Sequence, residues 1–151
     1  MRAVKPFEEF IREGIVKVQS SDKSRANFLI KESEQNYSYL LELIKKMGVR
    51  DTNANNYIKN CYDLLMELVR AKMLLKGYNS SGSGAHESEV AYCRGLGFSE
   101  VEIQFLDQMR FFRNGMLYYG TILDREYAEK VIEFTKKVYS KLRKLLDNSR
   151  Q

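Results

Sequence analysis

ANNYIKNCYDLLMELVRAKMLLKG, the stretch from Ala54 to Gly77, carries the clearest helical pattern in the chain. Its apolar residues step alternately by four and three positions, at Tyr57, Cys61, Leu64, Leu68, Ala71 and Leu75. A mean spacing of about 3.5 residues keeps one seam of a helix facing its neighbours in an up-and-down bundle. This helix is expected to begin after Thr52 or Asn53 and to run to Lys76, because Gly77 can close it.

Three more long helices are predicted around this stretch. One runs from Ser24 to Met47, where apolar and small residues recur at helical spacing, and Gly48 can end it. Another begins at Ser99, because Glu102 stands three residues later and can complete a capping box. The last begins after Asp124 and again shows the bundle period. The predicted fold class is therefore all-α, an up-and-down helical bundle of four long helices plus a short helix.

The remaining segments are predicted to be minor parts of one domain spanning residues 1–151. Residues 1–20 form an accessory segment, in which Pro6 to Val18 could be a further helix. Residues 78–85 are expected to form a flexible loop, since Asn79 to Gly84 contains no apolar side chain. The short helix should follow this loop, from about His86 to Arg94.

Composition excludes several classes of protein. Cys61 and Cys93 lack Cys-x-x-Cys spacing, so neither a metal nor another cofactor is expected, and both thiols are expected in the core. No apolar run reaches the roughly 20 residues that a membrane span needs, and acidic residues near the N-terminus argue against a signal peptide, so a cytoplasmic location is expected. The net charge of +5 permits nucleic-acid contact, although lysine-rich terminal helices are also common as solvated faces.

Chemistry-bearing residues cluster in the stretch RFFRNGMLYYG, from Arg110 to Gly120. Arg110 and Arg113 are three residues apart on a helix, so they could hold one phosphate between them. Asn114 is adjacent, and Gly115 allows a ligand or the backbone to approach closely. The alternative is structural: Arg113 forms an ion pair with a glutamate of the bundle or caps backbone carbonyls.

Two tyrosines extend this cluster. Tyr118 and Tyr119 offer a hydroxyl and a stacking face near the end of the helix. The structural alternative is that both rings fill the core and keep their hydroxyls at the surface.

Four motifs, taken in order, resemble the HEPN family over roughly Ser24 to Leu146. The segment from Tyr62 to Tyr78 is similar to the second HEPN helix, with its leucine-rich turn and Lys-Gly-Tyr ending. The remaining motifs are His86-Glu87 after the loop, Arg113-Asn114 in the capped helix, and Tyr118-Tyr119-Gly120. The family signature is an Arg, usually followed by Asn, and then a His after about four to six residues; Tyr118 stands at the His position.

The resemblance implies a site. In active HEPN proteins the Arg and His of two subunits meet in a dimer cleft and cut RNA without a metal. It therefore implies catalytic positions at Arg113 and Tyr118, and substrate-binding positions at Arg110, Asn114, Tyr119 and His86. A phenol with a pKa near 10 is a poor base at neutral pH, so reduced or lost cleavage is implied. His86 is either the substitute imidazole, if its loop folds back into the cleft, or a residue at the surface or helix start.

The function expected from the resemblance is that of an RNA- or nucleotide-associated protein. It would be the toxin-like partner of a minimal nucleotidyltransferase and would form a symmetric homodimer around Arg113. Two alternatives stay open: a non-catalytic dimeric module that binds a nucleotide or a protein partner, and a purely structural assembly domain.

Overall fold

The computed structural model describes residues 3–150, without the side chains of residues 117, 118 and 148–150. This part of the chain is mostly helical, as predicted. It holds four helices of at least 20 residues, namely α2 (Lys23–Met47), α3 (Ala54–Leu75), α5 (Glu100–Tyr119) and α6 (Arg125–Arg150). The other elements are α1 (Phe7–Arg12), β1 (Val16–Val18), β2 (Tyr78–Ser80), α4 (Ala85–Tyr92) and the 3-10 helix η1 (Cys93–Leu96). No described helix is both long and apolar enough to cross a membrane.

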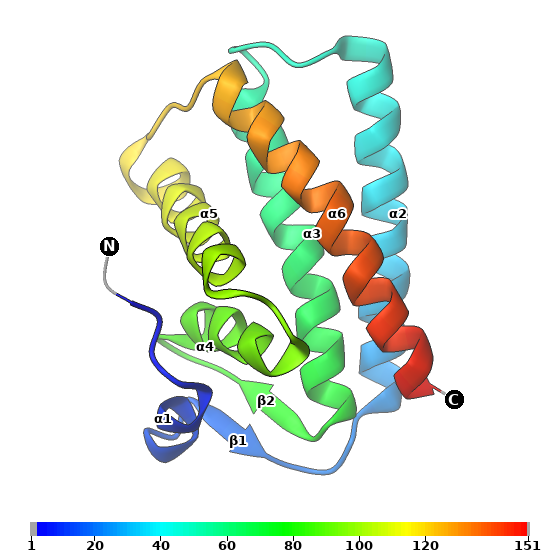
Figure 1. Cartoon of the computed structure of the whole chain (residues 1–151), viewed down its shortest axis with the longest axis vertical. Helices are drawn as coiled ribbons and strands as arrows, with labels where there is room; N and C mark the ends of the chain where they lie inside the picture. The colour runs from blue at the N-terminus through cyan, green and yellow to red at the C-terminus, as the bar shows by residue number, and fades with distance from the viewer. Residues whose placement is uncertain (1–2, 151) are drawn as a thin grey trace.

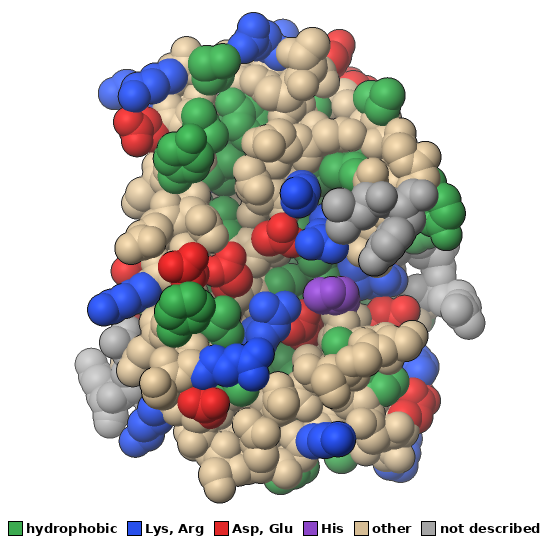
Figure 2. Space-filling view, turned by 180° about the vertical axis from the view of Figure 1, so that it is seen from behind, with side chains coloured by type: hydrophobic (Ala, Val, Ile, Leu, Met, Phe, Trp, Pro, Cys, Tyr) green, Lys and Arg blue, Asp and Glu red, His purple; other side chains and the backbone are tan. Residues whose placement is uncertain are grey.

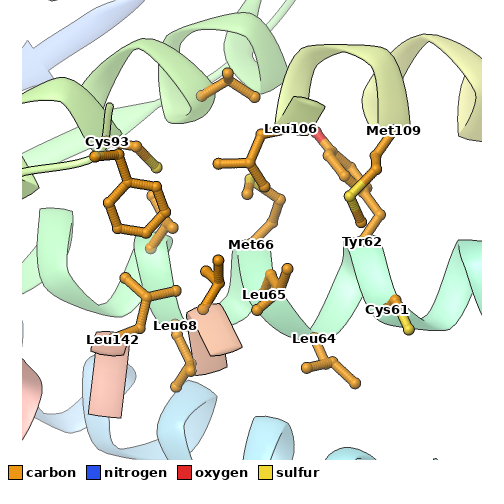
Figure 3. Close-up of a cluster of buried hydrophobic side chains, with 14 of the residues drawn as sticks. Cys61, Tyr62, Leu64, Leu65, Met66, Leu68, Cys93, Leu106, Met109 and Leu142 are labelled. Carbon is orange, nitrogen blue, oxygen red and sulfur yellow. The ribbon is translucent and has the colours of Figure 1, made fainter. Parts of the chain in front are cut away.

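Helix α3 is the centre of the molecule. It packs against α2, α6, α5 and α4, and Figure 1 shows it between α2 and α5 with α6 lying across it. Fourteen of its 22 residues are buried, so it buries more than the single seam that the sequence pattern predicted. In Figure 3, Tyr62 and Met66 point towards α5, whereas Leu64 and Leu68 point the opposite way. A helix that is apolar on most of its surface is stable only when other elements surround it.

Helix α2 buries one stripe, in agreement with its amphipathic pattern. Ala26, Ile30, Ser33 and Leu40 are its buried residues. The Ser33 hydroxyl donates a hydrogen bond of 2.7 Å to the Leu64 carbonyl, which satisfies the one polar group in this stripe. Asp22 caps the helix by accepting from the Arg25 amide, and Gly48 ends it with a positive φ.

The segment at the N-terminus differs from its prediction. The expected helix from Pro6 to Val18 ends at Arg12, and β1 follows and pairs antiparallel with β2, at the start of the predicted flexible loop. Gly14, with φ of 77°, turns the chain out of α1. The two valines of β1 suit an extended backbone, and β2 supplies the hydrogen-bonding partner that a lone strand lacks.

Helix α4 and the start of α5 lie over the same end of α3. Helix α4 packs against both α3 and α5, and it agrees with the predicted short helix. The predicted capping box at Ser99 is present, because the Ser99 hydroxyl accepts from the Glu102 amide and the Glu102 carboxylate accepts from the Ser99 amide. Asp124 caps the start of α6 by accepting from the Tyr127 amide, as predicted.

The loop between α5 and α6 folds back onto α5. Gly115 makes this possible: a Cβ on this residue would lie 2.7 Å from the Thr121 hydroxyl oxygen. Asn55 of α3 anchors the same loop, donating to the Thr121 carbonyl and accepting from the Leu123 amide, each over 2.8 Å. The close approach at Gly115 is therefore made by the chain itself.

Candidate functional site

A cavity of about 430 Å³ lies where α2, α3, α4 and α5 meet, and it is called the Arg113 cavity below. Arg113 reaches it from α5 and His86 from α4. The other lining residues come from α3 and α2: Tyr62, Asp63, Met66, Glu67, Arg70, Phe28, Leu29 and Glu32. Its volume is within the range of small-molecule sites. Arg113, predicted as a catalytic position, and His86, predicted as a substrate-binding position, thus line one cavity although they are 27 positions apart in the chain.

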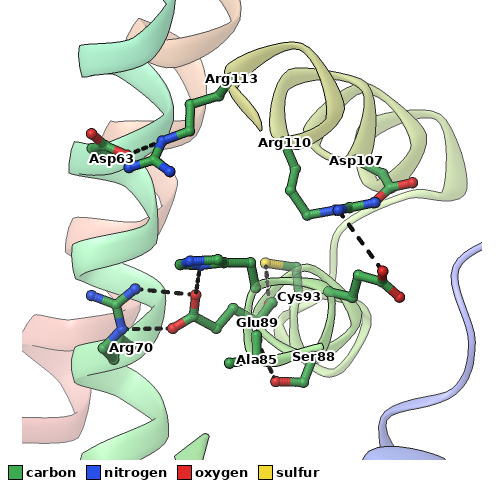
Figure 4. A network of polar contacts seen from close by, with 11 residues as sticks. Asp63, Arg70, Ala85, Ser88, Glu89, Cys93, Asp107, Arg110 and Arg113 are labelled. Carbon is green, nitrogen blue, oxygen red and sulfur yellow. Dashed lines mark hydrogen bonds and ion pairs between the residues drawn. The ribbon is translucent and has the colours of Figure 1, made fainter. Parts of the chain in front are cut away.

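Arg113 forms an ion pair across the cavity. Its Nε lies 3.2 Å from Oδ1 of Asp63, and Figure 4 shows the side chain extending from α5 towards α3. This is the structural alternative of the sequence analysis, with an aspartate in place of the expected glutamate. The bond uses one of the five N–H donors of the guanidinium, so the group keeps the capacity to bind an anion.

Arg110 points elsewhere. Its Nε donates to Asp107 over 2.8 Å and its Nη1 lies 3.9 Å from Glu87. It lines a separate cavity of about 350 Å³ that also contacts the N-terminal segment. Figure 4 shows the Arg110 and Arg113 guanidinium groups directed to different partners. A single phosphate held between the two arginines, as their spacing allowed, would require both side chains to leave these partners.

A buried carboxylate holds His86. The Glu89 side chain is 1% exposed, and it accepts two hydrogen bonds from Arg70, from Nε over 2.6 Å and from Nη2 over 3.1 Å. Its Oε1 also lies 3.2 Å from Nδ1 of His86, whose ring is half exposed. The bidentate bond from Arg70 stabilises the charge that Glu89 carries in this buried position.

Sequence reasoning missed the residues that hold the site together. Asp63, Arg70 and Glu89 were not predicted to take part. Two signals were present: Arg70 stands between the apolar residues Val69 and Ala71 of the predicted helix, and Glu89 follows His86 by three positions, the spacing of neighbours on a helix face.

Tyr62 places a buried hydroxyl at the base of the cavity. The hydroxyl is inaccessible to solvent and has no hydrogen-bond partner among the described residues. Burial, followed by the nearby Glu89 carboxylate, raises the pKa of Tyr62 well above its ordinary value, so this group is a neutral hydrogen-bonding phenol. Buried polar groups are normally paired, so this unpaired hydroxyl is an exception, and its burial keeps it out of contact with the open space of the cavity.

Acidic residues line the α2 and α3 side of the cavity. Figure 2, in which the single histidine is purple, shows acidic and basic side chains gathered around it on one face. Glu32, Asp63 and Glu67 line the cavity together with the cations Arg70 and Arg113. Burial raises the pKa of Glu67, and a hydrogen bond of 3.0 Å from the Asn36 amide partly opposes this. The cavity is therefore of mixed charge.

The other predicted site residues lie outside this cavity or outside the described side chains. Asn114 is partly buried next to Arg113 and does not line the cavity. Tyr119 is 85% exposed at the end of α5, so its ring is not in the core. Tyr118 belongs to α5, but its side chain is outside the described residues.

The thiols and acidic groups offer no second reactive centre in the described part of the chain. No cluster of three or more His, Cys, Asp and Glu residues there could hold a metal ion. Cys61 and Cys93 are free and buried, as predicted, and burial raises the pKa of Cys61 to about 12. A thiol with so high a pKa stays protonated and unreactive at neutral pH.

Comparison of the chain with models of protein families found no match, and comparison with curated proteins found none either. The function proposed below accordingly rests on the geometry of the Arg113 cavity and on the motif resemblance.

Proposed function

We propose that this chain is a HEPN-type RNA- or nucleotide-associated protein that binds a phosphate group in the Arg113 cavity. The observation that carries the proposal is the meeting of Arg113 and His86, from two different helices, in one ligand-sized cavity. On the family resemblance, such a protein would be the toxin-like partner of a minimal nucleotidyltransferase.

Each wall of the cavity suits a different part of a nucleotide. The planar fork of the Arg113 guanidinium matches the oxygens of a phosphate. At the rim, the exposed ring of Phe28 offers a face on which a base can stack, a contact worth about 1–3 kcal/mol in single-strand-binding proteins.

The charge of the cavity sets the expected strength of binding. Asp63 competes with a phosphate for Arg113, and Glu32 and Glu67 repel one. Phosphate contacts therefore contribute less here than in a uniformly basic groove, and we expect modest affinity that falls as salt concentration rises.

We further propose that two copies form a symmetric dimer through the C-terminal end of α5. Phe111, Tyr119 and Ile122, on α5 and the loop after it, are large apolar side chains that are mostly exposed. Phe111 faces the N-terminal segment and Ile122 lies beside Phe105 and Tyr127, so a partner would have to cover both sides of this end of α5. Large apolar side chains left exposed on a helix are stabilised when a protein interface covers them. A dimer formed there would bring the two copies of α5 together.

The proposal is tested by titrating the protein into a fluorescein-labelled single-stranded RNA of about 16 nucleotides, the upper range of single-strand site sizes, and following fluorescence anisotropy. Arg113→Ala should weaken binding strongly. The matched control is Arg125→Ala, because Arg125 is also paired to a carboxylate, over 2.9 Å, but lies on the exposed start of α6.

Equal affinity in wild type and Arg113→Ala would overturn the proposal. Absence of RNA binding, combined with dimerisation in solution, would instead favour a structural assembly domain. Binding that Arg113→Ala abolishes, without any cleavage, is the behaviour of a non-catalytic binding module.

A further inference from the structure

A further cavity, of about 480 Å³, lies where α1, the junction of α3 with β2, and the end of α4 meet, and it is called the Tyr92 cavity below. Helix α4 packs against both α1 and β2, and Figure 1 shows these three elements side by side. The Tyr92 cavity shares no lining residue with the Arg113 cavity. Its volume is within the range of small-molecule sites.

Three aromatic rings form the apolar wall of this cavity. Phe7, Tyr78 and Tyr92 all line it, and all three side chains are partly exposed. Phe7 meets Tyr78 and Tyr92 edge to face, with ring centroids 5.2 Å and 4.9 Å apart. The same edge-to-face and offset-stacked arrangements are open to an aromatic ligand that joins the cluster.

The two tyrosines also bring hydroxyl groups to the wall. Neither the Tyr78 nor the Tyr92 hydroxyl is hydrogen-bonded to another described residue, and neither is sealed from solvent as the Tyr62 hydroxyl is. Burial, followed by the neighbouring Tyr78, raises the pKa of Tyr92 to about 12. The Tyr92 hydroxyl is therefore neutral at physiological pH and can accept a hydrogen bond from an N–H group or donate one to an oxygen.

Two opposite charges line the same cavity without partners. Glu8 is exposed on α1, and Lys76 is exposed at the end of α3. Neither forms an ion pair in the described part of the chain, whereas Glu9, next to Glu8, is paired with Arg12. Both charges are thus able to bind a ligand.

Arg94 is the other cation of the wall, and its donors are already engaged. Its Nε donates to Glu100 over 2.7 Å, its Nη1 donates to the Lys5 carbonyl over 3.1 Å, and its Nη2 donates to the Val4 carbonyl over 2.6 Å. These bonds hold the N-terminal segment and the start of α5 against η1. Lys76 is therefore the cation of the wall that can turn to an anionic group.

We infer that the Tyr92 cavity binds a zwitterionic aromatic amino acid. Its side chain packs on the three rings, its α-carboxylate pairs with Lys76, and its α-ammonium group pairs with Glu8. An aromatic anion would leave Glu8 unpaired and repelling it, and an aromatic cation would do the same with Lys76, so a zwitterion fits the charges of the wall best. The inference is independent of the proposed function, since the two cavities share no residue.

The chain contains no tryptophan, so indole fluorescence excited where tyrosine does not absorb reports the ligand alone. Three ligands with the same ring are compared: tryptophan carries both charges, N-acetyltryptophan carries only the carboxylate, and tryptamine carries only the ammonium group. The anisotropy of the indole emission is followed as wild-type protein is added. Tryptophan should bind saturably, and more tightly than either of the other two ligands.

Variants of the wall assign each contact. Lys76→Gln should weaken binding of tryptophan and N-acetyltryptophan by about two- to fivefold, the range of a solvent-accessible ion pair, and leave tryptamine unchanged. Glu8→Gln should weaken binding of tryptophan and tryptamine by a similar factor and leave N-acetyltryptophan unchanged. Tyr78→Leu should weaken binding of all three ligands by about two- to tenfold, because it removes one ring. Lys31→Gln and Glu126→Gln are matched controls, since both residues are exposed and line neither cavity.

Several results would overturn the inference. Tryptophan that gives no saturable change in anisotropy would show that the cavity does not bind it. Losses of the same size in the two control variants would place the binding elsewhere. N-acetyltryptophan that binds as tightly as tryptophan would remove Glu8 from the site, and the zwitterion with it.

Discussion

At the scale of single residues, Arg70 and Arg113 both form ion pairs beside the same cavity, but their partners differ in burial. Asp63, the partner of Arg113, is 36% exposed, whereas Glu89, the partner of Arg70, is 1% exposed. Water can therefore solvate Asp63 after its partner is removed, and it cannot solvate Glu89 in the same way.

This difference predicts unequal losses of stability. Arg70→Ala should lower the free energy of unfolding by about 3–5 kcal/mol, because it leaves a buried carboxylate unpaired. Arg113→Ala should cost at most about 1 kcal/mol, as for other solvent-accessible pairs. Urea unfolding followed by far-ultraviolet circular dichroism measures both. Similar losses of unfolding free energy for the two variants would contradict this prediction, because they would mean that the buried charge of Glu89 is not stabilised by Arg70.

Glu67 provides a second prediction at this scale, and it concerns anion binding. Glu67→Gln removes a negative charge from the cavity, so at neutral pH it should bind the labelled RNA more tightly than wild type does. Burial raises the pKa of Glu67, so on acidification the wild-type carboxyl takes up its proton earlier than an ordinary glutamate. The variant therefore binds RNA more tightly than wild type at pH values above this raised pKa. The difference in affinity is lost as pH falls through that pKa, because the wild-type carboxyl is then neutral too. Anisotropy titrations over a pH series test this, and weaker binding by Glu67→Gln at neutral pH would contradict it.

At the scale of elements, the junction between α3 and β2 depends on a glycine. Gly77 has φ of 83°, and a Cβ there would collide with the backbone carbonyl oxygen of Gln19. Gly82 is a matched control, because it has φ of 77° but a Cβ added to it would meet no atom within 4 Å.

Alanine substitutions at the two glycines should therefore separate strain from collision. Gly82→Ala should cost about 1–2 kcal/mol of unfolding free energy, from the left-handed backbone alone. Gly77→Ala should cost more, about 3 kcal/mol or above, because the Gln19 backbone must also move. Urea unfolding again gives both values, and equal costs would argue against the close approach of the two segments.

The elements also show which parts of the fold the local sequence pattern can predict. Periods of 3.5 to 3.6 residues and capping signals at Asp124 and Ser99 predicted the long helices, because both are encoded within a few neighbouring residues. The strands β1 and β2 were missed because each has three residues, and their pairing joins segments about 60 positions apart. Such pairing depends on tertiary structure, which local pattern does not contain.

The same limit applies to the site. Arg113 and His86 were each selected from sequence, one by the motif and one as the sole imidazole. Their meeting depends on how α4 and α5 pack against α3, and the anchoring of His86 depends on Arg70, which comes from a third helix. The direction of Arg110, away from Arg113, likewise depends on the carboxylates at Asp107 and Glu87.

At the scale of the whole molecule, the proposed dimer makes a prediction about assembly. Light scattering at tens of micromolar should report twice the chain mass of 17.7 kDa. Phe111→Glu and Ile122→Glu should each shift the population to monomer, because they place a charge where apolar side chains would be desolvated, and the helical signal should stay unchanged. Wild type that is monomeric at this concentration would contradict the proposed interface.

The proposed function requires that the RNA binds in the Arg113 cavity, with His86 on its wall. His86 is the only histidine of the chain, so its ring-proton signals in the NMR spectrum belong to this residue without further assignment. The labelled RNA is titrated into wild type, Arg113→Ala and Arg125→Ala. We predict a saturable shift of the His86 ring signals in wild type and Arg125→Ala, and none in Arg113→Ala. Ring signals that stay fixed while anisotropy shows the strand fully bound would contradict binding in this cavity.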